Sequence, residues 1–80
     1  MTKHDIEEFV EEWPPSTQLN IYLVNGFNAT VVAKNDIVEV GKETVEIIDP
    51  YGNRNLIPAG HIMLMKFSAL QSPEHNGKKR

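Results

Sequence analysis

The chain has 80 residues, a net charge of −3 and no cysteine. This length allows one domain, which buries only about 60–65% of the surface of its unfolded chain, so its core is marginal. The missing cysteines exclude disulfides and thiolate metal sites, which leaves oligomerisation as the expected source of extra stability. No apolar run approaches the ~18 residues of a membrane-spanning helix, and the start, MTKHDIEEF, lacks a signal-peptide layout. We expect a soluble cytoplasmic protein that does not enter a membrane.

The first segment has the period of a helix. Its apolar residues recur at i, i+3, i+4 and i+7, on one face, and they are Ile6, Phe9, Val10 and Trp13. Thr2 followed three residues later by Asp5 is typical of an N-terminal cap, and Pro14-Pro15 stops the helix because proline lacks an N–H. The pattern predicts a helix over residues 3–13 whose opposite face is acidic.

Beyond the prolines the period changes from 3.6 to 2, which is typical of strands. In residues 18–24 one face carries Leu19, Ile21 and Leu23, and the other carries Asn20, Tyr22 and Val24. Asn25-Gly26 is a strong hairpin signal. Further β-type runs span residues 29–33, 37–40, 44–48, 55–57 and 61–67.

Polar and proline-containing breaks separate these runs. Residues 34–36 interrupt what reads as one long strand, Asp49-Pro50-Tyr51-Gly52 fits a type I turn, and Pro58-Ala59-Gly60 permits a sharp bend. We therefore predict a mainly β, α+β fold over residues 1–70. In it, one helix precedes about five short, strongly bent antiparallel strands that curl into a small barrel. Residues 71–80, which end in Lys78, Lys79 and Arg80, are predicted to be a flexible basic tail.

The residues that carry chemistry in enzymes are not grouped here. The three histidines share no metal-ligand spacing, neither Ser16 nor Ser68 has the context of a nucleophile, and the five glycines form no phosphate-binding pattern. We predict that the protein is not an enzyme and uses no metal or cofactor. A DNA-binding function is disfavoured because the only predicted helix is acidic and phosphate would repel it.

The stretch IYLVNG, residues 21–26, following a short helix and leading into a bent barrel, resembles the bacterial Hfq branch of the Sm-like family. The resemblance covers residues 3–67 in outline. It implies a helix on a five-stranded bent sheet, and subunits that join through their fourth and fifth strands into a homo-oligomeric ring, usually a hexamer. It also implies binding of single-stranded RNA, with a role in post-transcriptional regulation.

Family properties transfer only to matching positions. Tyr22 matches the aromatic residue that stacks on bases in the purine-binding face, and a base stacked on an aromatic ring contributes ~1–3 kcal/mol. The other positions implied to bind RNA are the turn residues Asn25, Gly26 and Phe27, the polar residues Asn28 and Thr30, and His61.

The chain departs from the family at two other sites. Pro58-Ala59-Gly60, with His61 one place later, stands where the family has a Tyr-Lys-His signature in its uridine-binding pore, and the basic patch of the rim is missing. The face carrying Tyr22 is therefore the expected RNA-binding surface, with purine-rich RNA as its ligand. The alternative is an Sm-like or SH3-like barrel that serves only as a protein-interaction or assembly module, for which the acidic helix and the negative net charge argue.

Overall fold

The computed structural model describes residues 1–70, which form one α-helix, six strands and two short 3-10 helices. The elements are α1 (Lys3–Glu11), β1 (Thr17–Leu23), β2 (Asn28–Val31), η1 (Lys34–Asp36), β3 (Ile37–Val40), β4 (Thr44–Ile48), β5 (Arg54–Pro58), η2 (Ala59–His61) and β6 (Ile62–Ala69). The predicted fold class, a helix followed by antiparallel strands, is confirmed. The predicted tail, residues 71–80, lies outside the described residues. No helix within residues 1–70 is long and apolar enough to cross a membrane.

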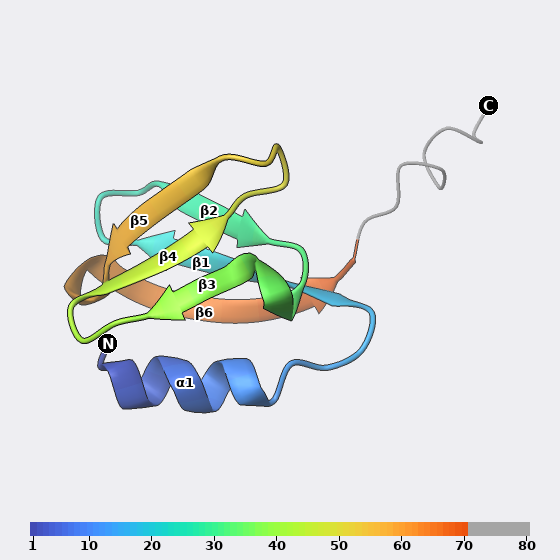
Figure 1. Ribbon diagram of the computed structural model, residues 1–80, viewed down its shortest axis with the longest axis horizontal. Helices are drawn as coiled ribbons and strands as arrows, with labels where there is room; N and C mark the ends of the chain where they lie inside the picture. Colours follow the sequence, from blue (N-terminus) through green and yellow to red (C-terminus); the bar gives the residue numbers. More distant parts are fainter. Residues whose placement is uncertain (71–80) are drawn as a thin grey trace.

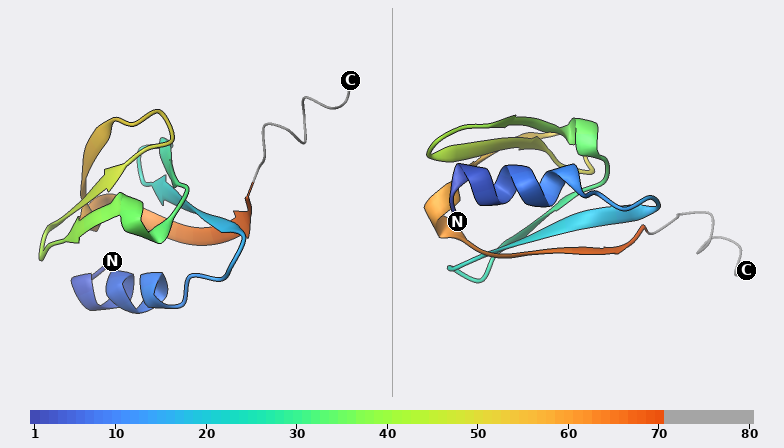
Figure 2. Two further views of the ribbon diagram at one scale, coloured as in Figure 1. Left: turned by 45° about the vertical axis from the view of Figure 1, so that its right-hand side comes forward. Right: turned by 90° about the horizontal axis from the view of Figure 1, so that it is seen from below.

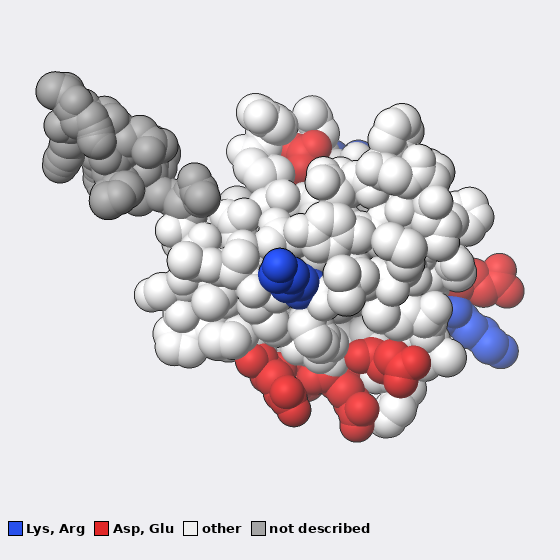
Figure 3. All heavy atoms as spheres, turned by 180° about the vertical axis from the view of Figure 1, so that it is seen from behind, with Lys and Arg blue, Asp and Glu red and all other residues white. Residues whose placement is uncertain are grey.

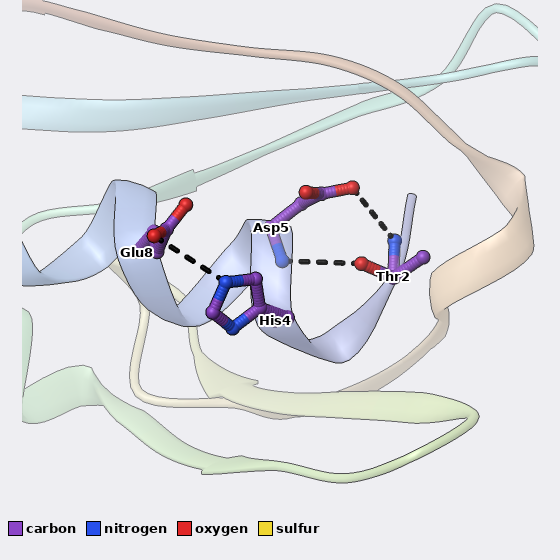
Figure 4. Close-up of polar contacts among 4 residues, drawn as sticks. All are labelled: Thr2, His4, Asp5 and Glu8. Atoms are coloured by element: carbon purple, nitrogen blue, oxygen red, sulfur yellow. Dashed lines mark hydrogen bonds and ion pairs between the residues drawn. The ribbon is translucent and has the colours of Figure 1, made fainter.

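The helix begins at a capping box. The Asp5 N–H donates to the Thr2 hydroxyl at 3.1 Å, and the Thr2 N–H donates to the Asp5 carboxylate at 3.4 Å (Figure 4). The helix ends at Glu11, two residues before the predicted end at residue 13. The reason is the Pro14-Pro15 pair, which restricts the backbone of Trp13. The N–H groups of Glu12 and Trp13 therefore donate to the carbonyls three residues back, those of Phe9 and Val10, each at 3.2 Å, as in a 3-10 turn.

The strands form two three-stranded antiparallel sheets, with the order β2-β1-β6 in sheet A and β3-β4-β5 in sheet B. Figures 1 and 2 show the two sheets lying one over the other, with α1 across the opening between them. The predicted five strands become six because η1, at the polar break of residues 34–36, carries the chain from sheet A to sheet B. His61, predicted on a strand, lies instead in η2.

The hydrophobic core lies between the two sheets and beneath α1. Its fully buried side chains come from the helix and from both sheets: Ile6, Leu19, Ile21, Val31, Val45 and Ile47. Trp13 contributes at the edge, where its indole N–H donates to the Thr17 carbonyl at 3.0 Å and its ring meets Phe67 edge-on at 5.2 Å. The predicted inward face of β1 is therefore confirmed.

The predicted β1–β2 hairpin is present. The Gly26 N–H donates to the Leu23 carbonyl at 3.0 Å, and the Leu23 N–H donates to the Phe27 carbonyl at 2.9 Å. Gly26 has a φ of +93°, a left-handed conformation that glycine adopts without strain. The Asn25 side chain accepts from the Phe27 N–H at 3.0 Å, which fixes the turn.

Candidate nucleic-acid interface

The side of sheet A that faces away from the core is polar, and strand pairing decides which residues share it. On β1, Asn20 pairs with Thr30 of β2 and Lys66 of β6, and Tyr22 pairs with Asn28 and Leu64. We call this surface the outer face; its residues are Gln18, Asn20, Tyr22, Asn28, Thr30, Leu64, Lys66 and Ser68. None of these side chains is buried, so the outer face is accessible within the described part of the chain.

A hydrogen-bond network centred on Asn20 orders the middle of the outer face. The Asn20 amide donates to the Ser68 hydroxyl at 2.8 Å, and the Asn20 carbonyl oxygen accepts from the Gln18 amide at 3.3 Å. The Thr30 hydroxyl approaches the same oxygen at 3.5 Å. These bonds join all three strands of sheet A, so the polar groups beside Tyr22 are held in place on a rigid surface.

Tyr22 lies half-buried in this surface, between Asn28 on one side and Leu64 on the other. Leu64 is 48% exposed, so the ring of Tyr22 has both an apolar and an amide neighbour. An aromatic side chain with amide and hydroxyl groups beside it can stack on a nucleobase and offer hydrogen bonds to the edge of that base.

The turn residues predicted to bind RNA lie at one end of the outer face. Asn25 and Gly26 form the tip of the β1–β2 hairpin, and Phe27 follows them with 71% of its surface exposed. His61 lies beside this hairpin, because its carbonyl oxygen accepts from the Val24 N–H at 2.9 Å. The fold therefore brings the seven predicted site residues to one face and its adjoining end.

A hollow of about 300 Å³ opens next to β2 and adds residues that the sequence did not indicate. One wall is Asn28, Ala29 and Thr30 of β2, and the other is Asp49, Pro50 and Tyr51 of the β4–β5 turn together with Asn55 of β5. Figures 1 and 2 show this turn lying close to β2, although the two segments are about 20 residues apart in the sequence. We call it the β2–turn hollow. Asn20 lies on the same face of β1 as Tyr22, so the alternation of the sequence could have identified it as a residue of this surface. Nothing in the sequence around Tyr51 and Asn55 indicates that they lie next to β2.

Asp49 is the charged group of this hollow. Its pKa is lowered from the ordinary value of 3.8, chiefly because the Asn53 N–H donates to the carboxylate; bonds from the Asn55 side chain and the Tyr51 N–H act in the same direction, and partial burial opposes them. The Asp49 Oδ1 atom accepts from the N–H groups of Tyr51 and Asn53, each at 2.9 Å. The carboxylate therefore stays ionised at neutral pH.

Acidic residues are separated from most of the outer face. Figure 3 looks at the molecule from the side of sheet A: acidic side chains gather along the edge where α1 runs, and the rest of that side is mostly uncharged. Lys66 is the cation of the outer face, on the central row with Asn20. The negative net charge is thus displaced from the predicted RNA-binding surface, which leaves that surface free of strong repulsion toward phosphate.

A larger hollow, of about 700 Å³, lies elsewhere, between the start of α1, the β3–β4 turn and η2. Its walls include Ala59 and Gly60, which stand where the resemblance places the pore signature, and none of the predicted RNA-binding residues. Within residues 1–70 there is no group of three His, Cys, Asp or Glu side chains that could hold a metal ion.

Two bent three-stranded sheets with a helix across their opening define the Sm-like class of small barrels. Among solved structures, the chain is similar to the crystal structure of the pleiotropic translational regulator Hfq, with a TM-score of 0.57 and 22% sequence identity over 78% of this chain and 97% of that one. No family model and no curated protein matches the sequence. The chain therefore has the Hfq-like fold, and the resemblance seen in IYLVNG is confirmed at the level of the fold.

Proposed function

We propose that this protein binds single-stranded, purine-rich RNA on the outer face of sheet A and acts in post-transcriptional regulation in the cytoplasm. The observation that carries the proposal is the environment of Tyr22, an accessible aromatic ring set among ordered amide and hydroxyl groups on a rigid sheet. The likeness to a translational regulator supports it. No role as an enzyme is proposed.

Lys66 supports contact with the RNA backbone. It lies on the outer face two residues along β6 from Leu64, the neighbour of Tyr22, so a strand whose base stacks on Tyr22 can bring a phosphate near its ammonium group. Binding through phosphate releases counterions and is therefore salt-dependent.

We further propose that the chain assembles into a ring, with six subunits as the expected number. Within residues 1–70, β5 pairs only with β4 and β6 pairs only with β1, so each leaves one edge without a partner strand. Both strands also expose large apolar side chains, Leu56 at 67% and Met63 at 61%. Pairing β5 of one subunit with β6 of the next covers both edges and both side chains.

The first experiment measures the solution mass by light scattering. The proposed ring gives a mass several times that of the 9.1 kDa chain. Leu56→Lys places a charge on the β5 edge and should reduce the mass toward that of the monomer. Val38→Lys, an equally apolar and 51% exposed position on β3, is the matched control and should leave the mass unchanged. A wild-type monomer contradicts the ring.

The second experiment measures fluorescence anisotropy of labelled oligo-A and oligo-U at low and at physiological salt. We expect oligo-A to bind more tightly. Each phosphate that Lys66 neutralises should add somewhat less than one to the magnitude of the log–log salt slope, and Lys66→Gln should remove that increment. No binding of either oligonucleotide contradicts RNA binding and favours the second candidate, a protein-interaction module that uses the acidic face of α1.

A further inference from the structure

We propose that Asn25, at the tip of the β1–β2 hairpin, is a site of spontaneous deamidation, and that its conversion to aspartate or isoaspartate lowers the affinity of the outer face for RNA. The effect on RNA rests on the proposed function and adds a means of regulation to the same surface. The chemistry itself requires only the chain and water.

The reaction requires an asparagine whose following backbone nitrogen is unshielded. A side chain on the following residue hinders the approach of that nitrogen to the asparagine side chain, so glycine is the favourable neighbour. Among residues 1–70 only Asn25 is followed by glycine. A Cβ added at Gly26 would meet no atom within 4 Å, so there is open space beside its backbone. Asn25 is also exposed, so water has access and ammonia can leave.

The reaction has two steps, and both take place on the hairpin tip. The deprotonated Gly26 nitrogen adds to Asn25 Cγ, and the Cγ–Nδ2 bond breaks, so ammonia leaves and a cyclic imide forms. Water then opens the imide. Cleavage between Cγ and the Gly26 nitrogen gives aspartate, and cleavage at the Asn25 backbone carbonyl gives isoaspartate. In total, an amide and a water become a carboxylate and an ammonium ion.

The Phe27 N–H is placed to assist the first step. It donates to Asn25 Oδ1 at 3.0 Å. Negative charge develops on this oxygen when the Gly26 nitrogen adds to Cγ, and a donor that already points at the oxygen stabilises that charge. The bond also directs the Asn25 side chain back along the chain past Gly26, because it joins the two residues that flank this glycine.

A second hydrogen bond opposes the reaction. The Gly26 N–H donates to the Leu23 carbonyl at 3.0 Å, so the nitrogen must lose this bond before it attacks Asn25. An exposed hairpin tip opens more readily than the strands that it joins. We therefore expect a slow conversion whose rate follows the opening of the turn. A ligand that binds the closed turn should slow the conversion further.

Conversion changes both the charge and the shape of the RNA-binding surface. None of the residues of the outer face or of this turn is acidic, and Lys66 is the cation of the outer face. A carboxylate at position 25 would repel phosphate at the end of this surface. Isoaspartate also inserts an extra main-chain carbon before Gly26. That carbon should displace Phe27 and weaken the bond from the Leu23 N–H to the Phe27 carbonyl.

The first measurement follows the reaction in the full chain at mildly alkaline pH by peptide mass spectrometry, which detects the conversion of an amide to a carboxylate. Asn76-Gly77 is the same pair, lies outside the described residues and serves as the internal reference. In denaturant both asparagines should convert at similar rates. In the native chain Asn25 should convert more slowly than in denaturant, and more slowly again with oligo-A. A native chain in which Asn76 converts and Asn25 stays intact overturns the site.

The second measurement compares the affinity of variants for labelled oligo-A by fluorescence anisotropy at low salt. Asn25→Asp reproduces one product, and the affinity should fall by about tenfold because like charges are brought together. Asn35→Asp adds the same charge at an exposed position in η1, outside the outer face, and is the matched control that should keep the affinity. Equal losses in both variants would show a general charge effect and overturn the regulation.

Aged protein gives the same comparison without a substitution in the hairpin. Ageing the Asn76→Gln chain leaves Asn25 as the reactive asparagine, and anion exchange separates the converted form. If the converted form binds oligo-A as tightly as the unconverted one, the regulation is overturned and the modification site stands. If unconverted protein binds no oligonucleotide, RNA binding and its regulation are both overturned, and mass spectrometry still decides whether Asn25 is modified.

Discussion

The two sides of sheet A are built from alternate residues of the same strands, yet they serve different ends. On the inner side Leu19 and Ile21 are completely buried in the core. On the outer side Asn20 and Tyr22 occupy the intervening positions and remain accessible. The hydrophobic effect fixes the first set, because each buried aliphatic side chain contributes about 1.5–3 kcal/mol. The hydrophobic effect does not explain why Asn20 and Tyr22 stand on the outer side. Because folding does not require particular residues at these exposed positions, they can be used for binding.

The largest expected effect is on the inner side. Ile21→Ala removes a side chain that is 1% exposed and leaves a cavity, so the free energy of unfolding should fall by about 2–5 kcal/mol. Urea unfolding followed by Trp13 fluorescence measures this loss, since Trp13 packs on Phe67. A loss below about 1 kcal/mol would mean that the inner side is not the stabilising one.

The next effect is on the outer side and on binding. Tyr22→Ala should weaken the affinity for oligo-A by about 5- to 150-fold, as expected for the loss of one stacked base, because the half-buried ring lies outside the core. Anisotropy titration measures it, and Tyr22→Phe should retain most of the affinity. If Tyr22→Ala instead lowered the free energy of unfolding as much as Ile21→Ala does, the outer side would also stabilise the fold, and the contrast between the two sides would be wrong.

Asn20 tests how far the outer side contributes to folding. Asn20→Ala removes the bond to the Ser68 hydroxyl and the acceptor of the Gln18 amide, in a half-buried position. We expect a loss of about 0.5–1.5 kcal/mol in the free energy of unfolding, smaller than for Ile21. Chemical denaturation gives the value. Ser68→Ala, which removes only one partner, is the control and should cost less.

The smallest effect concerns Asp49; it is present at neutral pH and disappears in acid. The pKa of Asp49 is lower in the folded chain than the ordinary 3.8, so its charge contributes stability above about pH 4, and the contribution is lost as pH falls through the folded-state pKa. Wild type should therefore exceed Asp49→Asn in urea midpoint at neutral pH, and the gap should shrink below about pH 4. A gap that is the same at every pH would contradict the assigned hydrogen bonds.

The features that the sequence predicted correctly are those that depend on local patterns. The capping box of Thr2 and Asp5, the alternation of β1 and the Asn25-Gly26 hairpin depend on neighbours within a few residues, and all three are present. The end of α1 was misplaced because the effect of Pro14 on Trp13 competed with the apolar periodicity. The break at residues 34–36 reads as an interruption of one strand, because nothing local shows that the next segment joins another sheet.

The sequence by itself determined which residues of β1 face the core and which face outward, and it placed Tyr22 and Thr30 on neighbouring strands. These follow from a period of two and a tight turn. Only the tertiary structure decided that sheet B and its turn bring Asp49, Tyr51 and Asn55 against β2, and that β5 and β6 each keep one edge without a partner strand among residues 1–70. The physical reason is that packing between sheets depends on the burial of both inner faces together, which no single segment encodes.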